Sequence, residues 1–241
     1  MDHARLCGWR PSIGINQKMV NFACLTFFPL PFASKPFTGL QILWGNLIID
    51  SPPSLALGVQ PAAPNVLTRL PRNPDQGIFT LKSGLLLILQ GVSLACLSVT
   101  LFVVEYVGYG YSVLDPRSAV YQDGLLHAQG HTFITISCMQ LAQGFAGRSL
   151  TASLFRQNLF SNVYLILGIA ISFSLLVACM YIPGWNGVFD QYPMNGYDWI
   201  VTFGFVVLHL TFVEGLKYCL RHNLWMKKKP LKPMEKEWFL G

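Results

Sequence analysis

Five apolar stretches of about membrane-spanning length divide this sequence and constrain its fold more than any other feature. A helix needs about 20 mostly apolar residues to cross a bilayer. Charged residues make up only 12% of the chain, which is about half the share found in an ordinary soluble domain. We therefore predict an all-α membrane protein, a helical bundle of five to six transmembrane segments. The five stretches are Gly39–Gly58, Ser83–Val107, Gly130–Ala146, Val163–Ile182 and Ile200–Tyr218.

The two ends of the chain depart from this pattern. Residues 1–38 contain a sixth apolar segment followed by a connector, and Pro29 and Pro31 interrupt that segment, so we interpret it as a partial or damaged helix. Residues 221–241 form a basic tail. The predicted transmembrane domain is therefore 39–220.

Positive charge alternates between the connectors. Arginine and lysine lie in 60–82, in 148–161 and in the tail, whereas the connector 183–198 has neither. The positive-inside rule then predicts a multi-pass integral membrane protein with a cytoplasmic tail. The polar stretch 108–129 is expected to be a loop on the opposite side.

The basic tail predicts contact with lipid rather than with nucleic acid. Its Lys227–Lys229 run has no interleaved aromatic residues and no nucleic-acid-binding motif beside it. We expect these lysines to meet anionic lipid headgroups, and we expect no nucleic-acid partner.

The first full stretch contains the residues best suited to chemistry. Asp50 lies in an apolar run, where an ionised carboxylate is costly and is a functional-site hypothesis by default. Asn46 precedes it by four residues, on the same helix face. Pro52 and Pro53 have no N–H, so the carbonyls of Ile48 and Ile49 lose their usual donors. These oxygen atoms would suit Ca²⁺, and to a lesser degree Mn²⁺.

The residues alone leave a second interpretation open. Asp50 could hydrogen-bond across the bundle while the two prolines only kink the helix, because polar groups within membranes also serve helix packing. Spacing does not decide between an ion site and a packing contact.

The same stretch resembles the sixth transmembrane helix of type II P-type cation pumps, the calcium-ATPase group. The resemblance rests on Gln41-x-Leu43-Trp44, on Asn46-Leu47-Ile48-x-Asp50 and on Ala56-Leu57-Gly58-x-x-Pro61. It implies that Asn46 and Asp50 contribute to the site of the transported cation. Ile49 stands where two-calcium pumps have Thr, which resembles the one-calcium secretory-pathway and plasma-membrane groups.

Two further segments resemble the same family. Residues 138–143, followed by Arg148-Ser149, resemble its eighth helix, and residues 17–21 resemble part of its fifth helix. The resemblance implies weaker, lining positions at Gln140, Gln143 and Asn21, beside the carbonyls of Ile48 and Ile49. Gln140 replaces a Glu of the two-calcium pumps, which again implies a single ion.

Several motifs of a complete pump are missing from these 241 residues. There is no Asp-Lys-Thr-Gly phosphorylation motif, no Thr-Gly-Glu motif and no nucleotide-binding region. The resemblance therefore implies the membrane sector of a calcium or manganese pump, with ATP and Mg²⁺ acting only in a complete pump and the remainder of the pump as a partner. The alternative is a non-catalytic, truncated fragment that packs with other membrane subunits. The sequence is equally compatible with a location in a Golgi-like, a vacuolar or a plasma membrane.

Other titratable residues are expected to be structural. Glu214 should pair with Lys217 or Arg221 near the cytoplasmic interface, and Glu105 should also be interfacial. His127 and His131 have the i,i+4 spacing of a metal pair, but the sequence offers no third ligand beside them.

Overall fold

The computed structural model describes residues 37–59, 81–108, 119–148, 153–154, 159–189, 191 and 193–221. Nearly all of these residues are helical, and no strand occurs among them, so the predicted all-α fold is confirmed for this part of the chain. The elements are α2 (Gly39–Trp44), the π-helix η1 (Gly45–Ile49), α3 (Ser51–Gly58), α4 (Leu81–Gly108), α5 (Ala119–Ala146), the short 3₁₀-helix η4 (Leu159–Ser161), α6 (Val163–Tyr181), α7 (Trp185–Val188) and α8 (Gly196–Arg221).

Two predicted segments fall largely outside the described residues. The partial helix expected within residues 1–38 lies outside the described residues, which include only Phe37 and Thr38 of its connector, and the basic tail is described only at Arg221. The resemblance of residues 17–21 to a fifth pump helix therefore stays a prediction.

Three of the described helices are long and apolar enough to cross a membrane. They are Gly84–Gly108 within α4, Val163–Tyr181, and Gly196–Cys219 within α8. Their outward side chains are mostly apolar, as expected for surfaces solvated by lipid tails. Large exposed apolar residues on α6 and α8 include Leu167, Ile171, Ile200, Phe203, Val207, Leu208 and Phe212.

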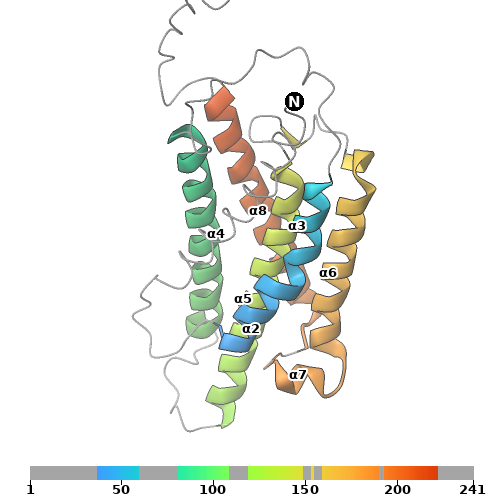
Figure 1. Cartoon of the computed structure of the whole chain (residues 1–241). Coiled ribbons are helices and arrows are strands. Elements are labelled where there is room, and N and C mark those ends of the chain that lie inside the picture. The colour runs from blue at the N-terminus through green and yellow to red at the C-terminus, as the bar shows by residue number, and fades with distance from the viewer. Residues whose placement is uncertain are drawn as a thin grey trace, which may run out of the picture.

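The bundle is arranged around α5, which packs against α4, α6 and α8 (Figure 1). The segment from α2 to α3 lies along α6 and also contacts α5. Ile49 is fully buried here, among Phe133 and Ile134 of α5 and Leu176 and Met180 of α6. The close helix packing expected of a membrane bundle thus includes the segment that carries Asp50.

The polar stretch 108–129 differs from the expected loop, because α5 already begins at Ala119. Tyr121 and Ala128 are buried against Phe102 and Tyr106 of α4. The Tyr106 hydroxyl donates a hydrogen bond of 3.0 Å to the Tyr121 hydroxyl. Tertiary packing thus extends the helix beyond its strongly apolar part, which sequence hydropathy cannot show.

A buried asparagine fastens the start of α6 to α3. The Asn162 side chain accepts a 3.1 Å hydrogen bond from the N–H of Leu165, which caps α6, and donates a 3.0 Å bond to the carbonyl of Ala56. Asn162 is only 1% exposed.

We expect Asn162→Ala to lower the free energy of unfolding by about 2 kcal/mol, since it removes both a helix cap and a buried hydrogen bond. The measurement is an SDS titration of the purified chain in mixed micelles, followed by circular dichroism. Asn162→Ser keeps a side-chain oxygen that can accept at the cap position and loses the donor to Ala56 without adding a buried charge, so its loss should be smaller. Equal losses for the two variants would show that the cap contributes nothing.

Candidate functional site

The segment with the predicted ion ligands changes its helical pitch in the middle. After α2, residues 45–49 form the π-helix η1, and the N–H of Asp50 donates to the carbonyl of Gly45 at 3.1 Å, five residues earlier. The helix is therefore widened at this point rather than unwound. Single π-helical turns of this kind are frequent at functional sites because they redirect the side chains that follow.

Pro52 and Pro53, which follow Asp50 after Ser51, lie in the first turn of α3. Two serine hydroxyls provide hydrogen bonds around them: Ser51 donates to the carbonyl of Leu47, and Ser54 donates to the carbonyl of Asp50 at 2.7 Å. Backbone groups in a membrane need such partners. The carbonyls close to Asp50 are thus partly engaged within the segment.

The structure places the two principal predicted ligands in different surroundings. Asp50 is only 4% exposed, within the packed interior of the bundle. Asn46 is exposed, and its amide nitrogen donates to the carbonyl of Ile42 at 2.9 Å. The widened turn therefore puts the carboxylate inside and the amide at the outer side of the segment.

A glycine of α6 allows the close approach of the proline pair. A Cβ atom added at Gly168 would lie 2.9 Å from the carbonyl oxygen of Pro52 and 3.2 Å from the nitrogen of Pro53. Only a residue without a side chain fits at this separation. The backbone of α6 thus supports the turn directly after Asp50.

The weaker predicted positions have varied surroundings. The Gln143 amide donates to Gln90 of α4 at 3.3 Å, and its oxygen lies 3.4 Å from Nε2 of His209 of α8. Gln143 thus takes part in a buried polar network between α4, α5 and α8. Gln140 is half-buried on α5, Ile49 is fully buried, and Ile48 lies in η1. Asn21 is outside the described residues.

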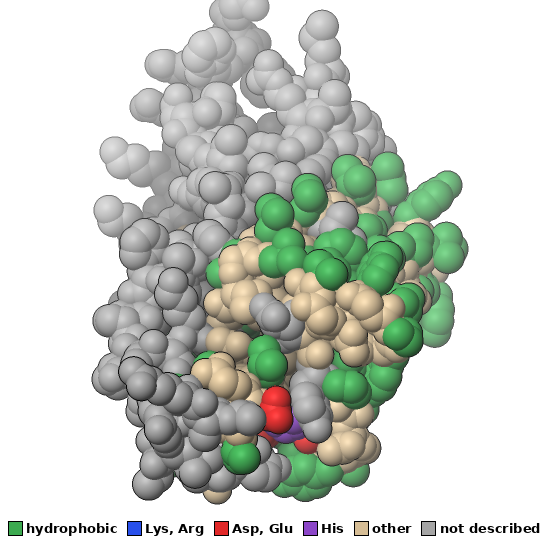
Figure 2. All heavy atoms as spheres, turned by 90° about the horizontal axis from the view of Figure 1, so that it is seen from below, with side chains coloured by type: hydrophobic (Ala, Val, Ile, Leu, Met, Phe, Trp, Pro, Cys, Tyr) green, Lys and Arg blue, Asp and Glu red, His purple; other side chains and the backbone are tan. Residues whose placement is uncertain are grey.

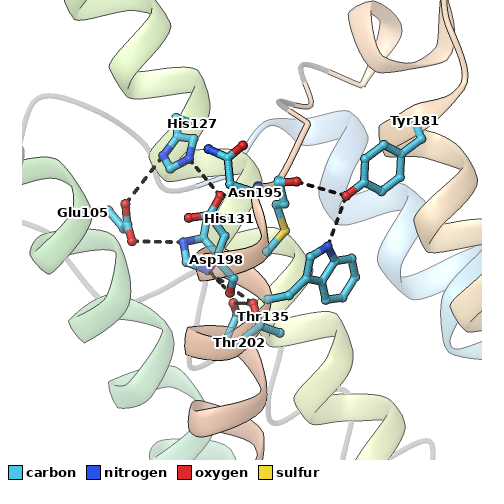
Figure 3. Close-up of polar contacts among 10 residues, drawn as sticks. Glu105, His127, His131, Thr135, Tyr181, Asn195, Asp198 and Thr202 are labelled. Carbon is cyan, nitrogen blue, oxygen red and sulfur yellow. Dashed lines mark hydrogen bonds and ion pairs between the residues drawn. The ribbon is translucent and has the colours of Figure 1, made fainter.

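A second polar cluster lies where α4 ends and α5 and α8 begin (Figure 3). Glu105 of α4 has one oxygen 3.0 Å from Nδ1 of His131 and the other 3.6 Å from Nδ1 of His127. Nε2 of His127 lies 3.4 Å from Oδ2 of Asp198 on α8. Nε2 of His131 lies 3.1 Å from the backbone carbonyl of Asp198 and 3.2 Å from the hydroxyl of Thr202.

The residues of this cluster are almost completely buried. The side chain of His131 is 0% exposed, those of Asp198 and Glu105 are 4% and 6% exposed, and that of His127 is 15% exposed. Viewed onto this end of the bundle, a small group of carboxylate and histidine atoms reaches the surface (Figure 2). Glu105, which the sequence predicts to be interfacial, faces two histidines of the neighbouring helix near the end of α4.

Comparison of the sequence with known proteins assigns the segment that contains these helices to one family. A sequence model of the family described as "Cation transporting ATPase, C-terminus" matches residues 34–219. The chain belongs to the cation-transporting ATPase family. Similar relatives include "Calcium-transporting ATPase 1" of Bacillus cereus, 35% identical over 73% of this chain, and "Calcium-transporting ATPase" of Bacillus subtilis, 30% identical over 80% of it. The human "Calcium-transporting ATPase type 2C member 1" is 29% identical over 77% of this chain.

The chain corresponds to one region of these longer ATPases. The matches cover 20% of each Bacillus protein and 18% of the human one. The resemblance to type II cation pumps is therefore confirmed at the level of the C-terminal transmembrane region. All the described helices lie at least partly within the matched range.

Only the two histidines of the histidine–carboxylate cluster of this ATPase region could be recognised as a pair from the sequence. The i,i+4 spacing of His127 and His131 was a usable signal. Glu105 and Asp198 come from helices far away in sequence, and no local pattern connects them to the pair. Among the described residues, no group of three or more His, Cys, Asp or Glu side chains is arranged to hold a metal ion.

Proposed function

We propose that this chain is the membrane sector of an ATP-driven pump that transports Ca²⁺, with Mn²⁺ as a second cargo ion, and that Asp50 supplies the charged ligand. The single observation that supports this most strongly is the carboxylate of Asp50, 4% exposed, directly after a π-helical turn and two residues before the proline pair Pro52-Pro53. A carboxylate at such a position is costly unless a cation or hydrogen-bond donors compensate for it. The names of the relatives favour calcium as the cation.

The exposed side of the same segment supports the proposal that further helices complete the site. Leu43, Leu47 and Leu55 are 58%, 59% and 75% exposed, and Asn46 lies on this segment between them. Ca²⁺ needs six or more oxygen ligands. Asp50 and Asn46 with nearby carbonyls provide a part of such a set. The remaining ligands, and the ATP- and Mg²⁺-dependent chemistry, belong in this proposal to the other parts of a complete pump.

The proposed orientation of the chain in the membrane follows from the distribution of its positive charges. We place the end of α8 that carries Lys217 and Arg221, and the basic tail after it, on the cytoplasmic side. The histidine–carboxylate cluster then lies at the opposite side of the membrane.

The proposal is tested by calcium binding to the purified full chain in lipid nanodiscs, measured with radioactive calcium at equilibrium. We expect Asp50→Asn to weaken binding by about tenfold or more, because it removes the only formal charge of the site while keeping its shape. Asn46→Ala should weaken binding less, since it removes a neutral oxygen. Competition with Mn²⁺ reports the second ion.

The matched control is Asp123→Asn, which makes the same chemical change at an exposed carboxylate of α5 and should leave binding unaltered. Equal binding by wild type and Asp50→Asn would refute the assignment of the ligand. Calcium binding that Asp50→Asn leaves unchanged would favour the alternative, a non-catalytic fragment that packs with other membrane subunits through its exposed leucines.

A further inference from the structure

A buried serine on α6 has a hydroxyl group that the packing of the bundle does not use. Ser172 is 0% exposed, and its Oγ has no hydrogen-bond partner within the described part of the chain. A serine within a helix commonly donates to the carbonyl four residues earlier, as Ser98, Ser137 and Ser174 do here at 2.8 Å. A buried hydroxyl without a partner costs free energy, so the position of this hydroxyl group needs a physical reason.

The position of Ser172 follows from the way in which α6 packs against the segment from η1 to α3. The two run antiparallel, side by side (Figure 1). Near the start of α6, Leu165 packs with Leu57 in one apolar cluster. One turn further along α6, a Cβ atom at Gly168 would lie 3.2 Å from the nitrogen of Pro53. Contacts between the two elements thus advance by three to four residues on each, which is the spacing of one helix face.

The next step of this register brings Asp50 opposite Ser172. Asp50 has right-handed helical backbone angles, φ −87° and ψ −24°, so it lies on the face of the segment that also carries Pro53. Ser172 lies one further turn along the same face of α6. Beyond this pair the two elements remain in contact, because Leu176 packs in one cluster with Ile49. Asp50 and Ser172 are both buried, at 4% and 0% exposure.

The backbones approach closely enough here for a short side chain to act between them. A Cβ atom at Gly168 would lie 2.9 Å from the carbonyl oxygen of Pro52, one turn of α6 away from Ser172. The oxygen of a serine side chain is only one carbon away from the backbone. Such a short side chain reaches a group on the neighbouring segment only where the two backbones are close together.

We propose, on the basis of the function proposed above, that Ser172 supplies a neutral oxygen ligand to the same cation that Asp50 binds. Ca²⁺ takes six to eight oxygen ligands at about 2.3–2.6 Å, so two of its ligand atoms can lie up to about 5 Å apart with the ion between them. A hydroxyl that lies opposite a carboxylate and is not used within its own helix suits this arrangement. The site then draws ligands from α6 as well as from the segment that carries Asp50.

The first test is equilibrium binding of radioactive calcium to the full chain in lipid nanodiscs. We expect Ser172→Ala to weaken binding by about fivefold, because it removes one neutral oxygen contact. Ser174→Ala is the matched control: it makes the same change at an exposed serine of the same helix and should bind like wild type. Binding that Asp50→Asn weakens and Ser172→Ala leaves unchanged would overturn this inference and leave the proposed function standing. Binding that neither variant changes would refute both.

A stability measurement separates a ligand from a packing contact. In EDTA, the SDS-unfolding midpoint of Ser172→Ala in mixed micelles should equal or exceed that of wild type, since the hydroxyl has no hydrogen bond to lose among the described residues. With Ca²⁺ added, the midpoint of wild type should rise more than that of Ser172→Ala, because the wild type binds the ion more tightly. A lower midpoint of Ser172→Ala in EDTA would identify a packing contact and overturn the inference.

Replacing oxygen by sulfur tests whether one cation contacts both side chains. Ser172→Cys exchanges a hard donor for a soft one of similar size, so it should weaken binding of Ca²⁺ and strengthen binding of Cd²⁺. An ultraviolet thiolate–Cd²⁺ absorption should accompany the stronger binding. Adding Asp50→Asn to Ser172→Cys should weaken Cd²⁺ binding again.

Ser174→Cys is the control for the cadmium measurement, because it contains the same number of cysteines and places the new one at an exposed position. It should bind Cd²⁺ like wild type. Equal Cd²⁺ affinities for Ser172→Cys and Ser174→Cys would overturn the inference, and this comparison decides it even where the chain by itself binds Ca²⁺ too weakly to measure.

Discussion

Gly168→Leu is expected to be the most damaging single substitution in the described part of the chain, lowering the free energy of unfolding by about 3 kcal/mol. A Cβ atom alone would lie 2.9 Å from the carbonyl oxygen of Pro52, closer than real Cβ contacts, and the neighbour is backbone that cannot rotate away. A leucine must therefore push α6 away from α3. The measurement is an SDS titration of the purified chain, followed by circular dichroism.

Gly204→Leu is the matched control for this prediction. Gly204 lies in α8, is exposed, and has no atom within 4 Å of an added Cβ. The same substitution there should be neutral or slightly stabilising, because glycine is a poor helix former. The change in unfolding free energy for Gly168→Ala should lie between those for Gly168→Leu and Gly204→Leu. Similar unfolding curves for Gly168→Leu and Gly204→Leu would show that α3 and α6 are not in close contact.

Lys217→Met is expected to have the second largest effect, a loss of about 3 kcal/mol of unfolding free energy. The side chain of Lys217 is 1% exposed, and its ammonium group donates to the carbonyl of Ala146 at 2.8 Å and pairs with Glu214 at 3.1 Å. Ala146 is the last residue of α5, so the positive charge lies at the negative end of that helix. Methionine keeps most of the volume but leaves the carbonyl and the carboxylate without this donor.

A double-mutant cycle separates the ion pair between Lys217 and Glu214 from the contact of Lys217 with the carbonyl of Ala146. Glu214 also accepts a 3.1 Å hydrogen bond from the N–H of Leu154, which Glu214→Gln can retain. We expect Glu214→Gln to cost less than Lys217→Met, and the double variant to cost less than the sum by about 1 kcal/mol. Strict additivity would mean that the ion pair contributes nothing to the free energy of unfolding beyond the other contacts of Lys217.

The pairing of Glu214 with Lys217 illustrates what local spacing can predict. A spacing of three residues on one helix places the two side chains next to each other on its surface. The pair was therefore expected from the sequence, and it is present. Glu105 illustrates the opposite case. Its position near the end of an apolar stretch suggested an interfacial carboxylate, and only the packing of α4 against α5 brings it to His127 and His131.

The predicted ion ligands also show which features the sequence predicts and which only the structure reveals. Sequence marked Asp50 and the prolines as an unusual group in an apolar stretch, and the structure confirms that Asp50 is buried. The i,i+4 spacing placed Asn46 on the same face, but the structure exposes Asn46 while it buries Asp50. Between them lies the π-helix η1, which changes the angle between successive side chains. Whether the two residues share a cation remains the prediction that the calcium experiment tests.

The sequence by itself determined that this chain is an all-helical membrane domain of the cation-transporting ATPase type, because apolar length, loop charge and the motif around Asp50 are properties of neighbouring residues. Tertiary structure alone decided where α5 begins, that Gly168 must accommodate the backbone of Pro52, and that two histidines and two carboxylates from three helices meet in one cluster. The physical reason is that the periodicity of apolar residues shows only which side of a helix avoids water. Contacts between helices depend on how each helix is rotated about its axis, how deep it lies and at what angle it crosses its neighbours. Residues far apart in the sequence determine these quantities jointly.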